Sequence, residues 1–367
     1  MKILLISGSY PPIKCGVGDY CYFLANALSQ NQSNVIGVLT STLNVEEKFQ
    51  SQVQIFPVMK NWRLFNMVQY IKILRDFKPN IVHIQYPTHG YGAGNLPWFL
   101  PSIAWLFGKK VVQTWHEGYT KKNAIKLFFK GIVPGALIYV KPEYQKKFRP
   151  YFMRWVFWNK LKVFIKNSSV IPVVNLAKHE IDQYRITYLK GQKRLIVFFG
   201  FMHPEKRVEL LFSIANPLTD TIVIAGEFDP KNSYHKEIYD FANSTQWSDK
   251  VQILGFLAEE IVAKLLAIAD AIILPFASGG GAWNTSLQAA SQQGSFVITT
   301  AQHPIGYDQD SNIYYSHIDD VSEMKLALEK WCSTKKNVSN EVTGDWNLIA
   351  HQHLLLYAAL LNGRGLD

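Results

Sequence analysis

The sequence is poor in cysteine and in long apolar runs. It has three cysteines in 367 residues, and Cys15, Cys21 and Cys332 lack the spacing of a metal site or a disulfide framework. A sparse, odd set is typical of a reducing compartment, so we expect a cytoplasmic location. No apolar run approaches the roughly 18 residues of a membrane-spanning helix, and the run 1–7 is too short for a signal peptide. A hydrophobic content of 48% excludes a disordered chain.

Acidic residues are almost absent from one long segment. Residues 121–166 contain twelve Lys or Arg and a single acid, Glu143, with eleven aromatic rings interleaved, and the chain has a formal net charge of +10. This mixture suits an anionic membrane surface. Solvated helix faces over a core, or a nucleic-acid groove, would use the same residues. Because no nucleic-acid-binding signature is present, we expect peripheral contact with the inner face of the plasma membrane through residues 121–166, and no nucleic-acid partner.

Short apolar runs alternate with helix-length segments, a pattern typical of parallel sheets. The length predicts two cores, and the strand series restarts near residue 190. We therefore expect an α/β fold of two Rossmann-like, doubly wound domains at 1–185 and 186–345, with a terminal helix at 346–367 that packs back on the first domain. The predicted strands are 2–7, 35–40, 80–85, 110–114 and 170–174, then 195–200, 221–225, 251–254, 271–275 and 296–299.

The strongest ligand motif follows the predicted strand 271–275. Three consecutive glycines let a ligand approach the backbone closely, because they carry no Cβ. Polar residues after them can cap a helix whose free N–H groups attract an anion such as a diphosphate. An ordinary strand-to-helix turn is the alternative interpretation. The motif consists of Gly279, Gly280, Gly281, Ala282, Trp283, Asn284, Thr285 and Ser286.

Two further motifs follow predicted strands of the first domain, at the sheet edge where open α/β sheets bind ligands. One loop carries Gly16, Val17 and Gly18, but it does not match the G-x-G-x-x-G dinucleotide fingerprint and is weak by itself. The other motif is His116 with Glu117, which leave a strand together. A lone histidine at such a position is more often structural than catalytic.

A fourth motif opens a helix in the second domain. Lys206 and Arg207 follow a strand that ends in Gly200, a position suited to neutralising phosphate. In combination and in this order, the four motifs resemble the retaining GT-B glycosyltransferases of the large group 1 family across nearly the whole chain. The resemblance extends to enzymes of cyanobacterial envelope-polysaccharide assembly. It implies a GT-B fold and a hexosyltransferase that uses a UDP-sugar donor, without a cofactor.

The resemblance also assigns roles to residues. It places Gly16 to Gly18 against the sugar diphosphate, His116 at the donor sugar, and Lys206 on the phosphate. Phe201 replaces the arginine that the family pairs with this lysine, and whether Arg207 compensates stays open. The predicted catalytic residues are His116 and Lys206; the predicted donor-binding residues are Gly16, Val17, Gly18, Glu117, Phe201, Arg207, Glu227, Phe256, Leu257 and residues 279–286 of the glycine motif.

One departure from the family matters most. Most members carry two glutamates eight positions apart, near the donor sugar and on the ribose, and alignment places Gly281 and Ala289 there. A branch of the family lacks both and relies on the helix N-terminus for the diphosphate, and this chain is closer to that branch. The ribose contact then falls to Gln288 or Glu227.

The expected reaction moves glucose from UDP-glucose to a saccharide or lipid-linked saccharide, with retention of configuration. No metal is expected, since Asp308 and Asp310 lie in a polar loop that predicts a turn. Two other classes stay open. A sugar-nucleotide epimerase shares the fold but needs more acid and base groups, and a non-catalytic binding subunit would explain the departures at Phe201, Gly281 and Ala289.

Overall fold

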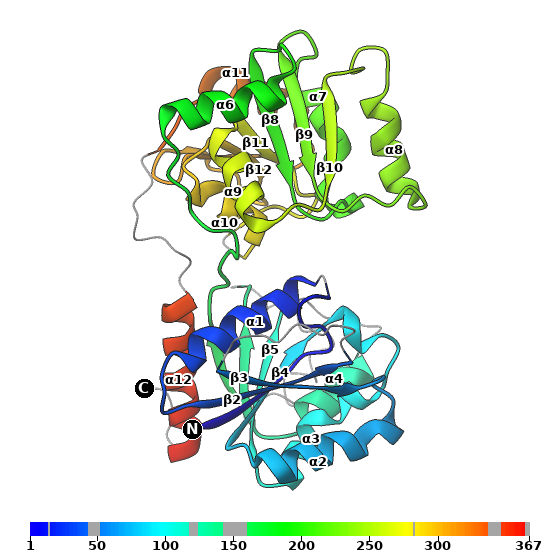
Figure 1. The fold of residues 1–367 in the computed structure, drawn as a ribbon, viewed down its shortest axis with the longest axis vertical. Coiled ribbons are helices and arrows are strands. Elements are labelled where there is room, and N and C mark those ends of the chain that lie inside the picture. The colour runs from blue at the N-terminus through cyan, green and yellow to red at the C-terminus, as the bar shows by residue number, and fades with distance from the viewer. Residues whose placement is uncertain are drawn as a thin grey trace. The chain divides into compact units, whose positions relative to one another are not determined.

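The computed structural model describes residues 1–13, 15–42, 52–116, 124–141, 160–281, 283–336 and 346–363. The chain forms two compact units, each with one parallel sheet covered by helices on both faces (Figure 1). Unit 1 comprises Met1–Lys166 and Asp345–Asp367, and unit 2 comprises Asn167–Gly344. Within the described ranges, no helix is long and apolar enough to cross a bilayer.

Unit 1 contains a seven-stranded parallel sheet of order β3-β2-β1-β4-β5-β6-β7. The order reverses direction between β1 and β4, so the loops after these strands lie at the switch point where such sheets bind ligands. The strands are β1 (Lys2–Ile6), β2 (Val35–Ser41), β3 (Val53–Met59), β4 (Ile81–Tyr86), β5 (Lys110–Trp115), β6 (Gly135–Tyr139) and β7 (Lys160–Phe164). The helices are α1 (Gly16–Ser29), α2 (Met67–Phe77), α3 (Leu100–Leu106), α4 (Ala124–Gly131) and α12 (Trp346–Asn362).

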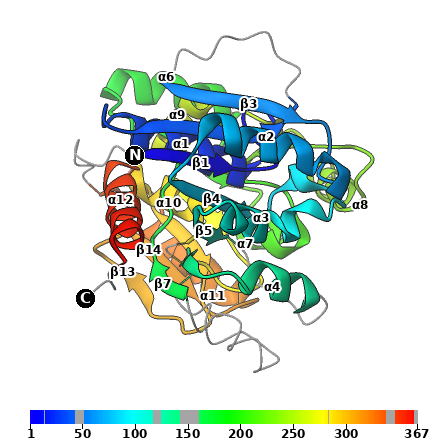
Figure 2. The same ribbon diagram turned by 90° about the horizontal axis from the view of Figure 1, so that it is seen from below.

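The two faces of this sheet are covered differently. Helices α1 and α12 pack together on one face, whereas α3 and α4 cover the other (Figure 2). Neighbouring residues of β5 point to these opposite faces: the Gln113 amide donates to the Lys130 carbonyl of α4, and the Thr114 hydroxyl bonds His83, which contacts α12. Every residue of β4 is buried, as expected for a strand covered on both sides.

Unit 2 repeats the architecture with the strand order β10-β9-β8-β11-β12-β14-β13, in which only β13 is antiparallel. Its strands are β8 (Arg194–Phe199), β9 (Asp220–Ala225), β10 (Val251–Gly255), β11 (Ala271–Leu274), β12 (Val297–Thr300), β13 (Gly306–Asp308) and β14 (Ile313–Ser316). Its helices are α6 (Lys178–Leu189), α7 (Leu211–Ile214), α8 (Ser233–Ala242), α9 (Glu259–Ile268), α10 (Thr285–Gln292) and α11 (Val321–Trp331). Two doubly wound sheets confirm the predicted α/β fold class.

Several details differ from the sequence-based expectations. The segment 170–174 forms no strand, and β6 and β7 close the unit 1 sheet instead. The lysines of β7 hid this strand, because its sequence KLKVF alternates cations with apolar residues. The expected domain boundary at 185/186 lies inside α6, which packs on β8, β9 and α9, so the structure places this helix wholly in unit 2.

Candidate functional site

The loop after β8 and the first turn of α10 lie together in unit 2. Gly200 follows β8 with φ of 138°, a conformation that favours glycine. A Cβ built on Gly200 would lie 3.7 Å from the Ser286 Cβ in α10. A Cβ on Gly226, just after β9, would lie 2.2 Å from the Gly200 carbonyl oxygen. The fold therefore joins two predicted motifs that are far apart in the sequence.

Lys206 ends the short turn η6 (Pro204–Lys206) that follows this strand. The N–H of Ala277 donates to the Glu205 carbonyl at 3.0 Å, and the Lys206 Nζ lies 4.3 Å from the centroid of the Phe276 ring. Both contacts tie the lysine turn to the loop that leads into α10. The cation is thus held in the same loop cluster as the helix N-terminus.

The neighbours of Lys206 do not supply a second cation in this arrangement. Arg207 has φ of 50°, and its guanidinium lies 3.2 Å from the Asp319 carboxylate and 3.9 Å from that of Glu209. Its charge is therefore already compensated by acidic partners. Phe201, which the resemblance in sequence aligns with an arginine, is 47% exposed and carries no charge.

The glycine loop uses its own N–H groups internally. Gly279, with φ of 83°, donates to the Phe276 carbonyl, and Gly280 donates to the Thr300 carbonyl at 2.7 Å. The Gly281 N–H donates to the side chain of Asn284 at 2.9 Å. Asn284 occupies the N-cap position, but its side chain points back to the glycine and does not cap α10. The loop shapes the site, and the anion-binding groups are those of α10.

The first turn of α10 keeps its N–H groups available. The first intrahelical donor is Gln288, whose N–H bonds the Asn284 carbonyl at 3.0 Å. The N–H groups of Thr285, Ser286 and Leu287 precede it and so have no acceptor within the helix. Together with the helix dipole, they make this end of α10 suited to a phosphate.

The two positions at which the resemblance in sequence expects a glutamate have little room for a longer side chain. Ala289 is completely buried, and a Cβ on Gly281 would lie 2.4 Å from the Trp283 ring. Gln288, one of the two residues considered for the ribose, is 9% exposed and donates to the Asn167 carbonyl at 2.9 Å. Glu227 is exposed in the loop after β9 and is the better placed of the two.

The predicted base-binding loops also follow neighbouring strands of unit 2. Phe256 comes directly after β10, behind Gly255 with φ of 69°, and is 54% exposed. Leu257 packs partly on the unit 2 core. Because β10, β9, β8 and β11 are adjacent in one parallel sheet, the loops after them share one edge. An exposed ring at that edge can stack on a base.

In unit 1, the loop after β1 leads into the N-terminus of α1. The helix begins at Gly16, and its first intrahelical bond runs from the Asp19 N–H to the Cys15 carbonyl at 2.9 Å. A Cβ on Gly18 would lie 3.0 Å from the Ser9 carbonyl oxygen, so glycine lets the loop fold tightly onto the helix. The N–H groups of Gly16 and Val17 have no acceptor within the helix.

His116 follows β5 and is half-buried. Its backbone N–H donates to the Tyr86 carbonyl at 2.7 Å, and its ring Nε2 lies 2.9 Å from the Gln85 Oε1. The ring packs edge-on against Tyr20, with centroids 4.7 Å apart. Burial, followed by repulsion from His353, lowers the pKa of His116 to about 3. The imidazole is therefore neutral near pH 7. It can orient a hydroxyl but cannot supply a charge.

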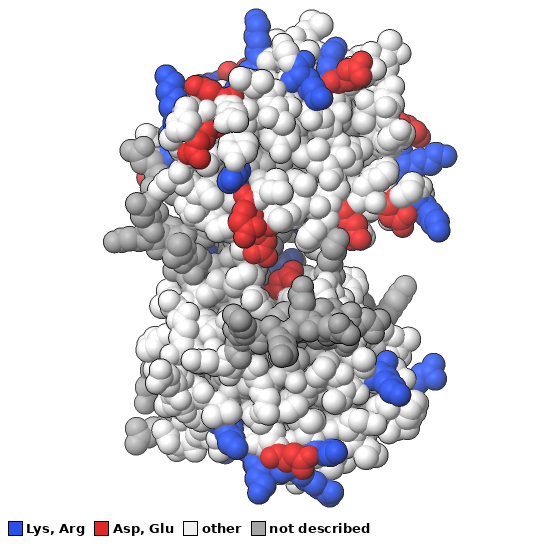
Figure 3. Space-filling view, in the orientation of Figure 1, with Lys and Arg blue, Asp and Glu red and all other residues white. Residues whose placement is uncertain are grey.

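Several predicted residues lie outside the described part of the chain, namely Glu117, Ala282 and, within the basic segment, residues 121–123 and 142–159. Two cations of that segment are not on the surface, contrary to the expectation. Lys130 is 6% exposed with its Nζ 4.0 Å from the centroid of the Tyr86 ring, and the equally buried Lys160 donates to the Val133 carbonyl. Burial lowers the pKa of Lys160 to about 8. On the face in Figure 3, the described Lys and Arg form small separate groups.

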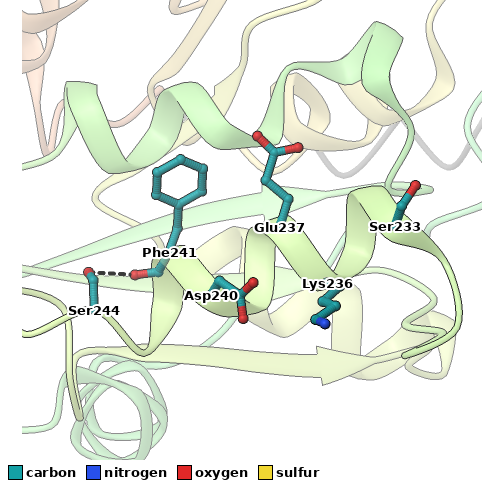
Figure 4. A pocket seen from close by; sticks show the side chains of 6 residues that line it. All are labelled: Ser233, Lys236, Glu237, Asp240, Phe241 and Ser244. Carbon is teal, nitrogen blue, oxygen red and sulfur yellow. Dashed lines mark hydrogen bonds between the residues drawn. The ribbon is translucent and has the colours of Figure 1, made fainter.

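A groove of about 430 Å³ runs along α8 of unit 2. Its lining comes from α8 and the turn after it (Figure 4). The ring of Phe241 stacks on Phe212 with centroids 5.4 Å apart. Apart from this ring the lining is hydroxyl, ammonium and carboxylate groups, as on any solvated helix. None of the predicted site residues lines this groove.

Sequence reasoning missed a buried polar cluster in unit 1. His83 and Gln85 occupy alternate positions of β4, so both face α1 and α12, and both are completely buried. His83 contacts Tyr357 of the terminal helix, whose helical spacing by itself predicts only packing, and Gln85 bonds His83. The signal that points to this cluster is two polar residues on one face of an otherwise apolar strand.

The chain has similar proteins among solved structures only. No protein-family model matches it, and no curated protein is similar in sequence. Solved structures do match. Sucrose-phosphate synthase from Thermosynechococcus elongatus superposes with a TM-score of 0.73 at 14% identity, over 99% of this chain and 100% of that one.

Two further solved structures also match over nearly the full length of both chains. A glycosyltransferase from Rickettsia africae has a TM-score of 0.72 at 14% identity, over 98% of both chains. HepE from Anabaena, solved with UDP and glucose, has a TM-score of 0.67 at 13% identity, over 99% of both chains. Likeness over nearly the full length, with two seven-stranded units, establishes that the chain has the GT-B glycosyltransferase fold.

Proposed function

We propose that the protein is a retaining glycosyltransferase that moves a hexose, glucose, from a UDP-sugar to a saccharide or lipid-linked saccharide. The observation that carries the proposal is the union of Lys206 with the N-terminus of α10. The Ala277–Glu205 hydrogen bond at 3.0 Å and the contact between Gly200 and Ser286 join these loops. A cation beside an uncapped helix N-terminus is suited to a departing diphosphate.

The chemistry requires stabilisation of the charge that develops on the diphosphate as the anomeric bond breaks. Lys206 contributes a full charge, and the N–H groups of Thr285 and Ser286 contribute hydrogen bonds and the helix dipole. In unit 1, we assign the N–H groups of Gly16 and Val17 to the donor's anionic portion. His116, being neutral, would accept a hydrogen bond from a donor sugar hydroxyl. These groups suffice without a metal ion.

The choice of a uridine nucleotide rests on Glu227, Phe256 and the structural neighbours. HepE has been solved with UDP-glucose, whereas starch synthase IV from Arabidopsis thaliana has been solved with ADP. The exposed Phe256 ring would stack on the base, and Glu227 would accept from the ribose hydroxyls. Calorimetry with UDP and ADP tests this choice, and tighter binding of ADP would contradict it.

The acceptor and the membrane contact belong to the same proposal. A lipid-linked acceptor would place the enzyme at the cytoplasmic membrane face, held through residues 121–166. The exposed Lys162 and Lys166 remain available for anionic headgroups, whereas Lys130 and Lys160 do not. Stronger sedimentation with anionic than with neutral vesicles supports this contact, and equal sedimentation with both contradicts it.

A non-catalytic sugar-nucleotide-binding subunit is the second candidate. It is favoured by the closed positions Gly281 and Ala289 and by the uncharged Phe201. Donor hydrolysis separates the two functions: slow release of UDP and free glucose from UDP-glucose is expected of the enzyme. Binding without any hydrolysis would identify a binding subunit. Absence of both binding and hydrolysis, with all sugar nucleotides offered, would overturn both.

A further inference from the structure

A continuous chain of buried hydrogen bonds connects the terminal helix to His116 within unit 1. The His83 Nδ1 lies 2.6 Å from the Tyr357 hydroxyl of α12, and its Nε2 lies 2.7 Å from the Thr114 Oγ1 and 3.2 Å from the Gln85 Nε2. The other end of the same amide, the Gln85 Oε1, lies 2.9 Å from the His116 Nε2. One glutamine therefore links two imidazoles.

An amide has a donor end and an acceptor end, so this link couples the tautomers of the two rings. With the Gln85 amide in the orientation given, its Nε2 and the Thr114 hydroxyl both donate to the His83 Nε2, which is then unprotonated, and the His83 Nδ1–H donates to the Tyr357 hydroxyl. The Gln85 Oε1 accepts, so the His116 Nε2 must carry the proton. The His116 Nδ1 is left as the acceptor, which is the atom that a sugar hydroxyl requires.

This alternation of donor and acceptor atoms along the chain of hydrogen bonds requires each ring to be neutral, and burial keeps the rings neutral. Burial lowers the pKa of His83 well below its usual range, with further lowering by His353 and then His116. The same cause lowers the pKa of His353 to about 4. Each neutral ring therefore has one donor and one acceptor nitrogen.

A second arm runs from α12 to the ring of His116. The His353 Nδ1–H donates to the Ile349 carbonyl at 2.7 Å, so its Nε2 is an acceptor for the Tyr20 hydroxyl at 3.3 Å. The Tyr20 ring in turn packs edge-on against His116, with centroids 4.7 Å apart. One arm therefore sets the proton position, and the other holds the plane of the ring.

We propose that α12 sets the tautomer and orientation of His116 through Tyr357, His83 and Gln85, which act as positioning residues for the donor sugar. The kinetic part of this inference rests on the proposed function, whereas the tautomer coupling does not. A cluster that served packing alone would need only satisfied hydrogen bonds. It would have no reason to end on the half-buried ring at the end of β5.

The test uses the full chain with ¹⁵N-labelled histidine, and NMR reads the protonation of each ring nitrogen. Tyr357→Phe removes one hydroxyl and keeps the ring. Tyr70→Phe is the matched control, because Tyr70 is also fully buried in unit 1 and its hydroxyl donates to the Leu100 carbonyl at 3.2 Å, outside the cluster. Gln85→Met provides a second break at the link itself.

We expect His116 protonated at Nε2 in the native protein and in Tyr70→Phe, and a mixture of tautomers in Tyr357→Phe and Gln85→Met. Hydrolysis of UDP-glucose should fall about tenfold in kcat in both cluster variants, by analogy with the loss of a hydrogen-bond partner of a metal-bound imidazole. The KM should change little, because unit 2 holds the nucleotide. An unchanged His116 tautomer in both folded cluster variants would overturn the proposal. Altered tautomers in a protein without hydrolysis would retain the coupling and reject the enzyme.

Discussion

The two units have the same architecture but differ in where they bury polar groups. Unit 2 buries carboxylates at the amino ends of its strands. Asp220 opens β9 and lies 2.6 Å from Arg194, and Asp270, just before β11, lies 2.8 Å from Arg185. Unit 1 instead buries neutral rings and amides near the carboxyl ends of β4 and β5, around His83.

The location of the buried polar groups indicates a role in stability for those of unit 2 and a role in function for those of unit 1. The carboxyl ends of the strands form the edge at which open α/β sheets bind ligands. Ion pairs at the opposite edge, as around Asp220, can only fix the strands and their helices. A neutral hydrogen-bonded cluster that reaches His116 lies toward the ligand edge, where a defined proton position has a use. We therefore expect the two sets to respond differently to acid and to mutation.

Mild acid should give the largest effect, and it should act on unit 1. Burial lowers the pKa values of His83, His116 and His353, so the unfolded state binds protons at these rings below about pH 6.5 while the folded state does not. Stability is complete above that pH and falls by about 1.4 kcal/mol per pH unit for each ring. For the three rings together, a drop from pH 6.5 to 5.5 should cost about 3 kcal/mol, because the unfolded rings are already half protonated at pH 6.5.

Urea unfolding followed by hydrogen exchange can assign this loss to peptides of each unit. The surrounding Tyr20 and Cys21 of α1 stay neutral, because burial raises the pKa of both. In the variant with His83→Gln and His353→Gln, the dependence of stability on pH should fall to about the share of His116 alone. If the unfolding free energy of unit 2 fell equally with pH, or if that of neither unit fell, the assignment of the effect to the buried histidines of unit 1 would be wrong.

Loss of a buried carboxylate should give a slightly smaller effect, and it should act on unit 2. Asp220 is fully buried and accepts from Arg194 and from the Asn216 N–H. Asp220→Ala should destabilise unit 2 by about 1–3 kcal/mol, because it leaves the partly exposed Arg194 and the Asn216 N–H without their acceptor. The control Asp319→Ala breaks the exposed pair with Arg207 and should cost about 1 kcal/mol or less. Similar shifts of the unfolding midpoint in both variants would contradict the distinction between a buried and an exposed ion pair.

Lys206→Met should lower the rate of donor hydrolysis by tenfold or more without changing stability. It removes a charge-assisted contact worth about 1.5–3 kcal/mol to a developing anion, and keeps most of the side chain over Phe276. Arg207→Met is the matched control, because its guanidinium is paired with Asp319. Steady-state kinetics and UDP calorimetry measure both. Equal losses in the two variants would remove Lys206 from its assigned role.

The sequence predicted the fold class and the positions of the site loops, because these depend on local patterns. Apolar runs that end in glycine, as at Gly200 and Gly279, mark strand ends without knowledge of the partner strands. The assignment of individual residues in those loops stays a prediction. A pattern cannot tell that the Asn284 side chain turns back to Gly281 and leaves α10 uncapped, since several local hydrogen bonds compete there.

Long-range features were beyond such patterns. The hydroxyl of Tyr357 meets His83 across 274 positions, and that of Tyr20 meets His353 across 333. Nothing in the helical spacing of 346–361 distinguishes these residues from ordinary core positions. Charge was misleading as well: Lys160 counts as a surface cation in the sequence, yet β7 buries it against the Val133 carbonyl.

The smallest expected effect is that of metal removal, and it tests the division between the two edges of unit 2. His317, Asp320 and Glu323 bring possible ligand atoms within 4.8 Å of one another, but hydrogen bonds already use these groups. The Asp320 carboxylate caps α11, and the His317 Nδ1 lies 2.8 Å from Glu323. Donor hydrolysis should therefore survive excess chelator unchanged. Loss of activity that magnesium or manganese restores would show that a cation, and not Lys206 with the α10 N-terminus, stabilises the departing diphosphate.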